Sequence, residues 1–161
     1  MAVLAPDEAA VLAAAGDRIF PADESSPAAS DLGLLAFAER QLGGPWGRGE
    51  RMYLRPPFAT PDHPGHGWQA AATPAEAVAA TLRGLLAGGF LDLDDAGRDA
   101  ALARLERDEP AAFALLRALV IESVLAHPSH GGNRAGAGWR WLGFPGDPVE
   151  LGQPYAGRLR R

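Results

Sequence analysis

The sequence predicts an all-α protein of about five helices in a small bundle, with two long irregular segments that are rich in aromatic residues. The apolar residues are mostly alanine and leucine, and isoleucine occurs only at Ile19 and Ile121, which favours helices over sheets. Apolar residues also recur at helical spacing in five stretches that end at proline or glycine. A chain of 161 residues fits one core, so we expect a single domain over 1–161.

The first two helices are predicted near the N-terminus. Pro6 suits a first helical position, and the spacing of the following apolar residues predicts a helix over 7–20. A second helix is expected to be capped by Ser30 or Asp31. It would run to about residue 42, where two glycines and a proline end it.

Three more helices are predicted in the second half of the chain. Thr73 and Glu76 form a capping box around a first-turn proline, which predicts a helix to about residue 87. Another is expected over about 94–107. Pro110 opens the fifth, which is the most apolar helix and is therefore expected to lie in the centre of the core.

Two irregular segments complete the predicted architecture. Residues 43–72 interrupt a helical core over about 7–126, and residues 127–161 follow it. Loops of this length are uncommon unless they are functional or disordered, and the aromatic residues argue against disorder. All four tryptophans and both tyrosines lie outside the predicted helices. Two compatible interpretations are open: these segments complete the core, and part of their surface packs on another protein, because interface hot spots are enriched in tryptophan, tyrosine and arginine.

The composition excludes several classes of chemistry. The chain has no cysteine, and all fifteen of its basic residues are arginine, so thiol, Schiff-base and Walker-lysine chemistry are absent. The net charge is −5 without a basic stripe, which argues against nucleic-acid binding. No apolar run is long enough to cross a membrane.

The four histidines form two HxxH pairs, His63 with His66 and His127 with His130. Imidazoles at this spacing can share a metal ion. Each pair spans a proline in a loop and has no evident third ligand. A small metal-dependent enzyme that uses these four histidines is therefore kept as an alternative.

The stretch from 127 to 146 combines six glycines with two tryptophans. It has no nucleophile elbow, and Trp141 stands where a dinucleotide loop needs its third glycine. The glycines predict positive φ angles or close backbone contacts, and Asn133 tolerates a left-handed conformation. If the stretch is extended, Trp139 and Trp141 lie on one face with Arg140 on the other, as an aromatic platform or as a small strand that seals the bundle.

Two motifs lie near opposite ends of the chain. The early one is RIFPAD over 18–23, followed by SPAA over 26–29. The late one comprises Pro128, Gly131-Gly132-Asn133, Gly138-Trp139 and GFPG over 143–146. Both resemble motifs of the subunit 3 (small subunit) family of gluconate 2-dehydrogenase and related flavoprotein dehydrogenases, in which a tyrosine stands at the position of His130.

This resemblance implies a companion of a large FAD-dependent subunit of the glucose–methanol–choline oxidoreductase type. That subunit would oxidise a sugar, a sugar acid or a related alcohol, often with a cytochrome c subunit as electron acceptor. The small subunit would support the folding and stability of the large subunit and, when it has the signal, its co-export, with no FAD, metal or catalytic residue of its own. Family members usually carry a twin-arginine signal, which this sequence lacks. From the sequence as it stands we expect a cytoplasmic protein. If the sequence is that of a processed form, we expect a periplasmic protein.

We expect segments 43–72 and 127–161 to contact the large subunit. The alternative from another class is a free-standing helical domain that binds a ligand. The candidate partner-binding residues are Trp46, Tyr53, Trp68, His130, Gly131, Gly132, Asn133, Arg134, Trp139, Arg140, Trp141 and Phe144.

Overall fold

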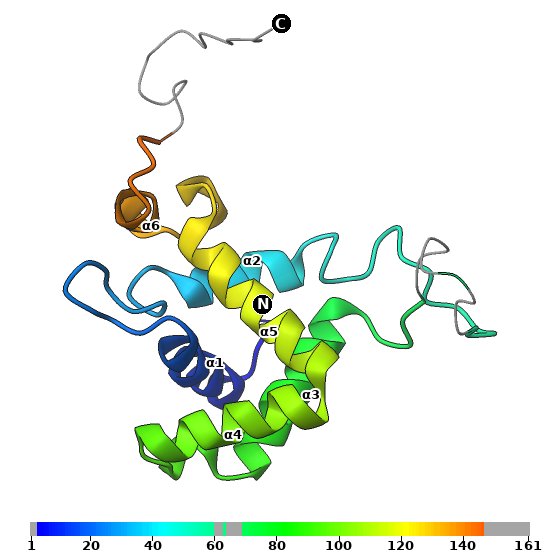
Figure 1. The fold of residues 1–161 in the computed structure, drawn as a ribbon. Coiled ribbons are helices and arrows are strands. Elements are labelled where there is room, and N and C mark those ends of the chain that lie inside the picture. Colours follow the sequence, from blue (N-terminus) through cyan, green and yellow to red (C-terminus); the bar gives the residue numbers. More distant parts are fainter. Residues whose placement is uncertain (1–2, 60–62, 64–68, 147–161) are drawn as a thin grey trace, which may run out of the picture.

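The computed structural model describes residues 3–59, 63 and 69–146, which fold into α-helices and short 3-10 helices (Figure 1). The α-helices are α1 (Pro6–Ile19), α2 (Leu34–Gly43), α3 (Pro74–Ala87), α4 (Asp95–Asp108), α5 (Pro110–Leu125) and α6 (Ala137–Trp141). The 3-10 helices are η2 (Phe90–Asp92), η3 (Pro128–His130) and η4 (Arg134–Gly136). These described ranges contain no strand, so the prediction of an all-α fold is confirmed. The sequence predicted α1 to α5 but not α6.

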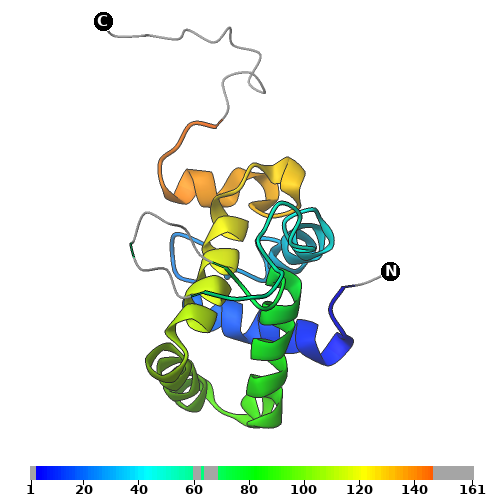
Figure 2. The same cartoon turned by 90° about the vertical axis from the view of Figure 1, so that its right-hand side faces the viewer.

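Helix α5 contacts each of the other five described α-helices, and one of its sides lies in the core, as its apolar sequence predicts, while the opposite side remains exposed. Its buried side carries Leu116, Leu119, Val120 and Val124, which pack among α1, α2, α3 and α4. Full burial of a side chain of this size contributes about 1.5–3 kcal/mol. Helix α4 lies at one end of α5 and α6 at the other in both views (Figures 1 and 2). None of the described helices is long and apolar enough to span a membrane.

The predicted start of α3 is confirmed in detail. The hydroxyl of Thr73 accepts a hydrogen bond from the Glu76 N–H, and the Glu76 carboxylate accepts one from the Thr73 N–H at 2.8 Å. These bonds satisfy two backbone donors at the helix start. The hydrogen bonds that the Glu76 carboxylate accepts from the N–H and the hydroxyl of Thr73 lower the pKa of this carboxyl below its ordinary value.

The predicted cap of α2 is wrong. Neither Ser30 nor Asp31 caps this helix, which begins later, after Gly33 with a φ of 98°. Ser30 instead donates its N–H and its hydroxyl to the carboxylate of Asp17 on α1, at 2.9 and 2.8 Å. This contact holds the turn before α2 against α1. Helix α2 itself begins only at Leu34.

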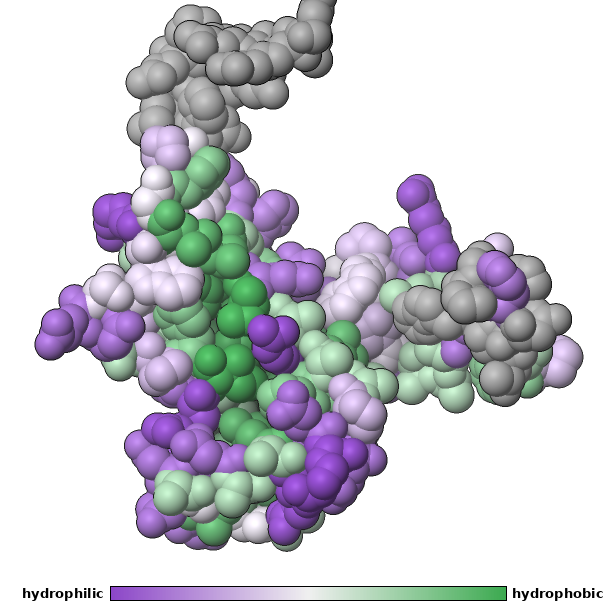
Figure 3. All heavy atoms as spheres, in the orientation of Figure 1, coloured by the Kyte–Doolittle hydropathy of each residue, from purple (hydrophilic) through white to green (hydrophobic). Residues whose placement is uncertain are grey.

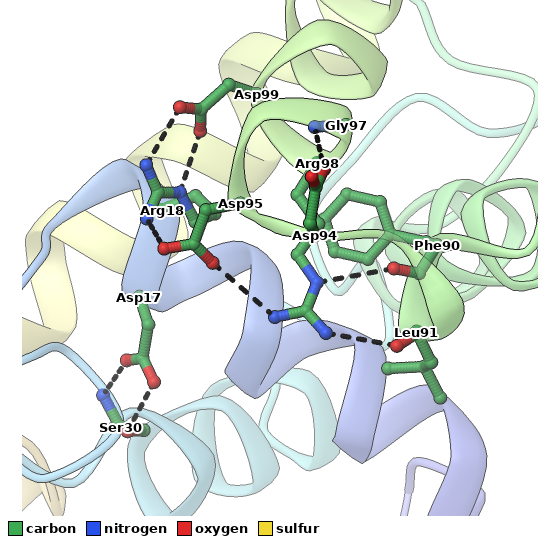
Figure 4. Close-up of polar contacts among 10 residues, drawn as sticks. All are labelled: Asp17, Arg18, Ser30, Phe90, Leu91, Asp94, Asp95, Gly97, Arg98 and Asp99. Atoms are coloured by element: carbon green, nitrogen blue, oxygen red, sulfur yellow. Dashed lines mark hydrogen bonds and ion pairs between the residues drawn. The ribbon is translucent and has the colours of Figure 1, made fainter.

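Ion pairs attach α4 to α1 at the surface (Figure 4). The Arg18 guanidinium donates two parallel hydrogen bonds to Asp99, at 2.7 and 2.8 Å, and a third to Asp95 at 2.7 Å. Arg98 donates to the carbonyls of Phe90 and Leu91 in η2. These contacts supplement the small apolar area of α4, which buries only Ala101 and Leu102. The hydrogen bonds from Arg18 hold the pKa of the Asp99 carboxyl below its ordinary value.

The irregular segment after α2 extends away from the bundle (Figure 1). Its start is attached to α3 by a hydrogen bond from the Ala75 N–H to the Gly47 carbonyl at 3.1 Å. Tyr53 is 77% exposed, and Phe58 is also exposed. These two aromatic residues therefore do not complete the core, which was one of the two interpretations of this segment.

Candidate functional site

Residues 127–146, here called the C-terminal cap, fold back over the end of α5. The helix ends when Ala126 takes an extended conformation with a ψ of 160°. Positive φ angles at Gly131, Asn133, Ala135 and Gly136 then turn the chain repeatedly before α6. Such angles are accessible to glycine and tolerated by asparagine, whereas Ala135 adopts one at a cost of about 1–2 kcal/mol.

Asn133 is the residue that connects the cap to α5. It is fully buried, and its backbone N–H donates to the Ser123 carbonyl at 2.7 Å. Its side-chain amide donates to the Ala126 carbonyl at 2.9 Å and accepts from the Gly138 N–H at 2.8 Å. One side chain thereby satisfies backbone groups at the end of α5 and at the start of α6.

Two glycines of the cap touch the backbone of α5 directly. A Cβ atom at Gly132 would lie 2.2 Å from the Ser123 carbonyl oxygen, and one at Gly138 would lie 2.0 Å from that of Val124. No side chain fits at such distances. The prediction of close backbone contacts is confirmed, and Gly131, Gly132 and Asn133 are shown to pack within this chain, where Gly131 lies against the backbone of α2.

The predicted aromatic platform is wrong. Trp139 and Trp141 lie in the helix α6, where residues two apart point in different directions. Trp139 is half-buried and donates its indole N–H to the Leu125 carbonyl at 2.8 Å. Trp141 packs edge-on against Phe20 at 5.1 Å between ring centroids and remains 42% exposed. Nor is there a strand here to seal the bundle.

An apolar and basic surface surrounds the end of α6. Leu142 is 55% exposed, and Phe144 is 47% exposed while packing edge-on against Trp139. Arg134 and Arg140 of the same cap are also exposed, and Arg140 donates to the Ala135 carbonyl. We define the α6 patch as Arg134, Arg140, Trp141, Leu142 and Phe144. Leu142 was missed from sequence, although the run Trp-Leu-Gly-Phe was visible as a signal.

The histidines lie at different places. His127 accepts or donates a hydrogen bond with the Ser129 hydroxyl at 2.8 Å, and its ring lies 6.4 Å from that of His130 and 5.5 Å from that of Trp139. His130 is exposed at the edge of an open hollow of about 400 Å³ between α2 and α5. Within the described ranges, no three histidine, aspartate or glutamate side chains gather as a metal site. His63 is exposed, whereas His66 and Trp68 lie outside the described residues.

The early motif has a structural role. One oxygen of the Asp23 carboxylate accepts hydrogen bonds from the N–H of Ser25, the hydroxyl of Ser25 and the N–H of Ser26, at 2.7, 2.7 and 2.8 Å. These bonds lower the pKa of the Asp23 carboxyl. They shape the turn that follows Phe20, whose ring packs against Trp141.

The remaining predicted docking residues belong to the segment that extends from the bundle. Trp46 is 36% exposed and Tyr53 is the most exposed large apolar side chain of the described residues. The structure does not bring these two residues into contact with the α6 patch.

Comparison with known proteins gives one result. The family model for gluconate 2-dehydrogenase subunit 3 matches residues 6–146, which is most of the chain. Neither the curated proteins nor the solved structures provide a match. The match covers both motifs, from the Asp23 turn to the cap over α5. The chain therefore belongs to the gluconate 2-dehydrogenase subunit 3 family.

Proposed function

We propose that this protein is a non-catalytic small subunit that binds and stabilises a large FAD-dependent dehydrogenase of the glucose–methanol–choline type. The large subunit would hold the FAD and oxidise a sugar, a sugar acid or a related alcohol, and a cytochrome c subunit would receive the electrons. The family name supports membership of a dehydrogenase complex. The contribution of this chain would be contact surface.

The α6 patch is the observation that carries this proposal. Trp141, Leu142 and Phe144 expose apolar area next to two arginines, and this combination is typical of interface hot spots. The patch has a firm support, because Asn133, Gly132 and Gly138 fix the cap to α5 through buried contacts. A preformed surface loses little conformational entropy on binding.

The proposal assigns different roles to the candidate residues. Gly131, Gly132, Asn133 and Trp139 would maintain the shape of the cap. The residues that would touch the partner directly are His130, Arg134, Arg140, Trp141, Leu142 and Phe144. Trp46 and Tyr53 would form a second, separate contact.

Co-expression with a large FAD-dependent dehydrogenase chain of the glucose–methanol–choline type from the same organism tests the proposal. With an affinity tag on the large chain, we expect this chain to co-purify and to raise the melting temperature of the flavoprotein, because a ligand of the folded state stabilises it. Flavin absorbance should be found in every fraction that contains the large chain and in none that contains only this chain. Failure of the two chains to co-purify, together with an unchanged melting temperature, would refute the proposed function.

A further inference from the structure

Helix α5 exposes an apolar side that the described residues do not cover. At about 3.6 residues per turn, the side opposite its buried residues carries Ala111, Ala114, Ala118 and Leu125, with Ile121 beside them. The three alanines are exposed, and Ile121 and Leu125 are half-buried. We call these five residues the outer face of α5.

This pattern differs from that of an ordinary surface helix. Such a helix has polar residues opposite its buried side, whereas the only charged residues of α5 are Arg117 and Glu122, at the two edges of the outer face. Helix α4 at the other end of the bundle follows the ordinary pattern, with aspartates, arginines and one glutamate along its exposed side. Burial among the described residues explains one side of α5 and leaves its outer face unexplained.

The outer face is continuous with the α6 patch. Helix α6 contacts the C-terminal part of α5, where the indole of Trp139 bonds to the Leu125 carbonyl. Figure 3 shows an apolar band that passes from the region of α6 across α5 toward α4. The cap itself carries Arg134 and Arg140 and no acidic residue. The whole surface is thus an apolar strip with positive charge at its α6 end.

From this continuity we infer that the large flavoprotein subunit lies along the outer face of α5 as well as on the α6 patch. The inference rests on the proposed function and adds the place and the chemistry of the contact. The matching surface of the partner is an apolar ridge, with carboxylates facing Arg134 and Arg140. Ala114 and Ala118, one turn apart, let that ridge approach the helix backbone closely, since contact distances depend on side-chain size.

A matched pair of substitutions tests this inference. Ala118→Arg places a long charged side chain on the outer face, and Ala103→Arg places the same side chain on the exposed side of α4. Arginine is a good helix former, so both variants should keep the helical content and melting temperature of the wild type. We expect Ala118→Arg to weaken binding to the large subunit by roughly tenfold or more, and Ala103→Arg to bind like the wild type.

Oxidative footprinting of the wild-type complex provides a test that depends on no variant. Hydroxyl-radical labelling of Ile121 and Leu125 should fall when the large subunit binds, whereas labelling of the half-buried Leu105 on α4 should not change. Wild-type affinity in Ala118→Arg, or unchanged labelling of Ile121 and Leu125 in the complex, would overturn the inference while leaving the proposed function intact. The inference would also be overturned if the isolated chain sediments as a dimer and Ala118→Arg dissociates this dimer without changing the affinity for the flavoprotein. Absence of any wild-type complex would instead refute the proposed function itself.

Discussion

The side-chain oxygen of Asn133 accepts a hydrogen bond from the backbone N–H of Gly138 at 2.8 Å, inside the protein. The amide nitrogen of the same side chain reaches the carbonyl of Ala126. The short helix α6 is therefore held to the last turn of α5 through one buried residue. The position of the α6 patch depends on this connection.

Replacing Asn133 should loosen the cap. Asn133→Ala removes both side-chain hydrogen bonds and leaves buried backbone groups unpaired, which costs about 1–3 kcal/mol for each unsatisfied group. Asn133→Gly keeps the left-handed conformation, with its φ of 46°, and removes only the hydrogen bonds. We expect both variants to unfold at lower urea concentration, with Asn133→Gly the less affected of the two. Wild-type stability in both would show that the cap does not depend on these bonds.

Two glycine substitutions should have opposite effects. Gly138→Ala forces a Cβ atom against the Val124 carbonyl. It should therefore lower the free energy of unfolding by about 2 kcal/mol, which is several times the effect of a typical surface substitution. Gly84→Ala lies at an exposed position within α3, where the new Cβ meets no atom within 4 Å apart from its own chain neighbours and the nearby helix backbone. It should raise the free energy of unfolding by about 0.5–1 kcal/mol, because glycine is a poor helix former. Urea unfolding of both variants checks the pair, and equal effects would contradict the packing described for the cap.

Acid should weaken the contact between α1 and α4. The pKa of Asp99 is lower in the folded protein than in the unfolded chain, because Arg18 donates hydrogen bonds to it. A depressed folded pKa contributes stability above the unfolded pKa, and this contribution is lost as the pH falls through the folded value. We expect the free energy of unfolding to fall less steeply with acid in Asp99→Asn than in the wild type.

Arg18→Leu is the matching variant for that experiment. It removes the hydrogen bonds that lower the pKa of Asp99, and should therefore flatten the same part of the pH profile. Because these groups are at the surface, both effects should be modest. Urea titrations from neutral pH to about pH 3 measure them. An acid dependence in both variants that equals that of the wild type would contradict this assignment.

The elements that local signals specify could be predicted from the sequence. The capping box at Thr73 and the apolar spacing of α5 depend on residues close together in the chain, and both gave the right helices. The start of α2 could not be found in this way, because the contact between Asp17 and Ser30 joins two elements. Caps that depend on tertiary contacts leave no local pattern.

For the α6 patch, only the types of residue could be predicted from the sequence, and not their arrangement. The run from 139 to 144 indicated exposed aromatic residues and arginine, but a helix of five residues is too short for its spacing to be recognised. In addition, Gly138 in this helix packs against the backbone of Val124 on α5, a contact between two elements that local spacing does not reveal. For this reason the sequence suggested an extended platform, whereas Trp139 turns inward and Trp141 stays at the surface.

The affinity of Trp141→Ala for the large flavoprotein subunit tests the central claim most directly. The variant loses the edge-on contact with Phe20, worth about 0.5–1.5 kcal/mol, and should retain its helical content because the ring is already 42% exposed. If the α6 patch is the docking site, binding should weaken by at least about 2 kcal/mol, roughly thirtyfold. Trp46→Ala, measured in parallel, shows whether the separate segment also contributes. Normal affinity and normal turnover of the Trp141→Ala complex would contradict the assignment of this surface, and normal assembly with a loss of turnover would contradict its non-catalytic role.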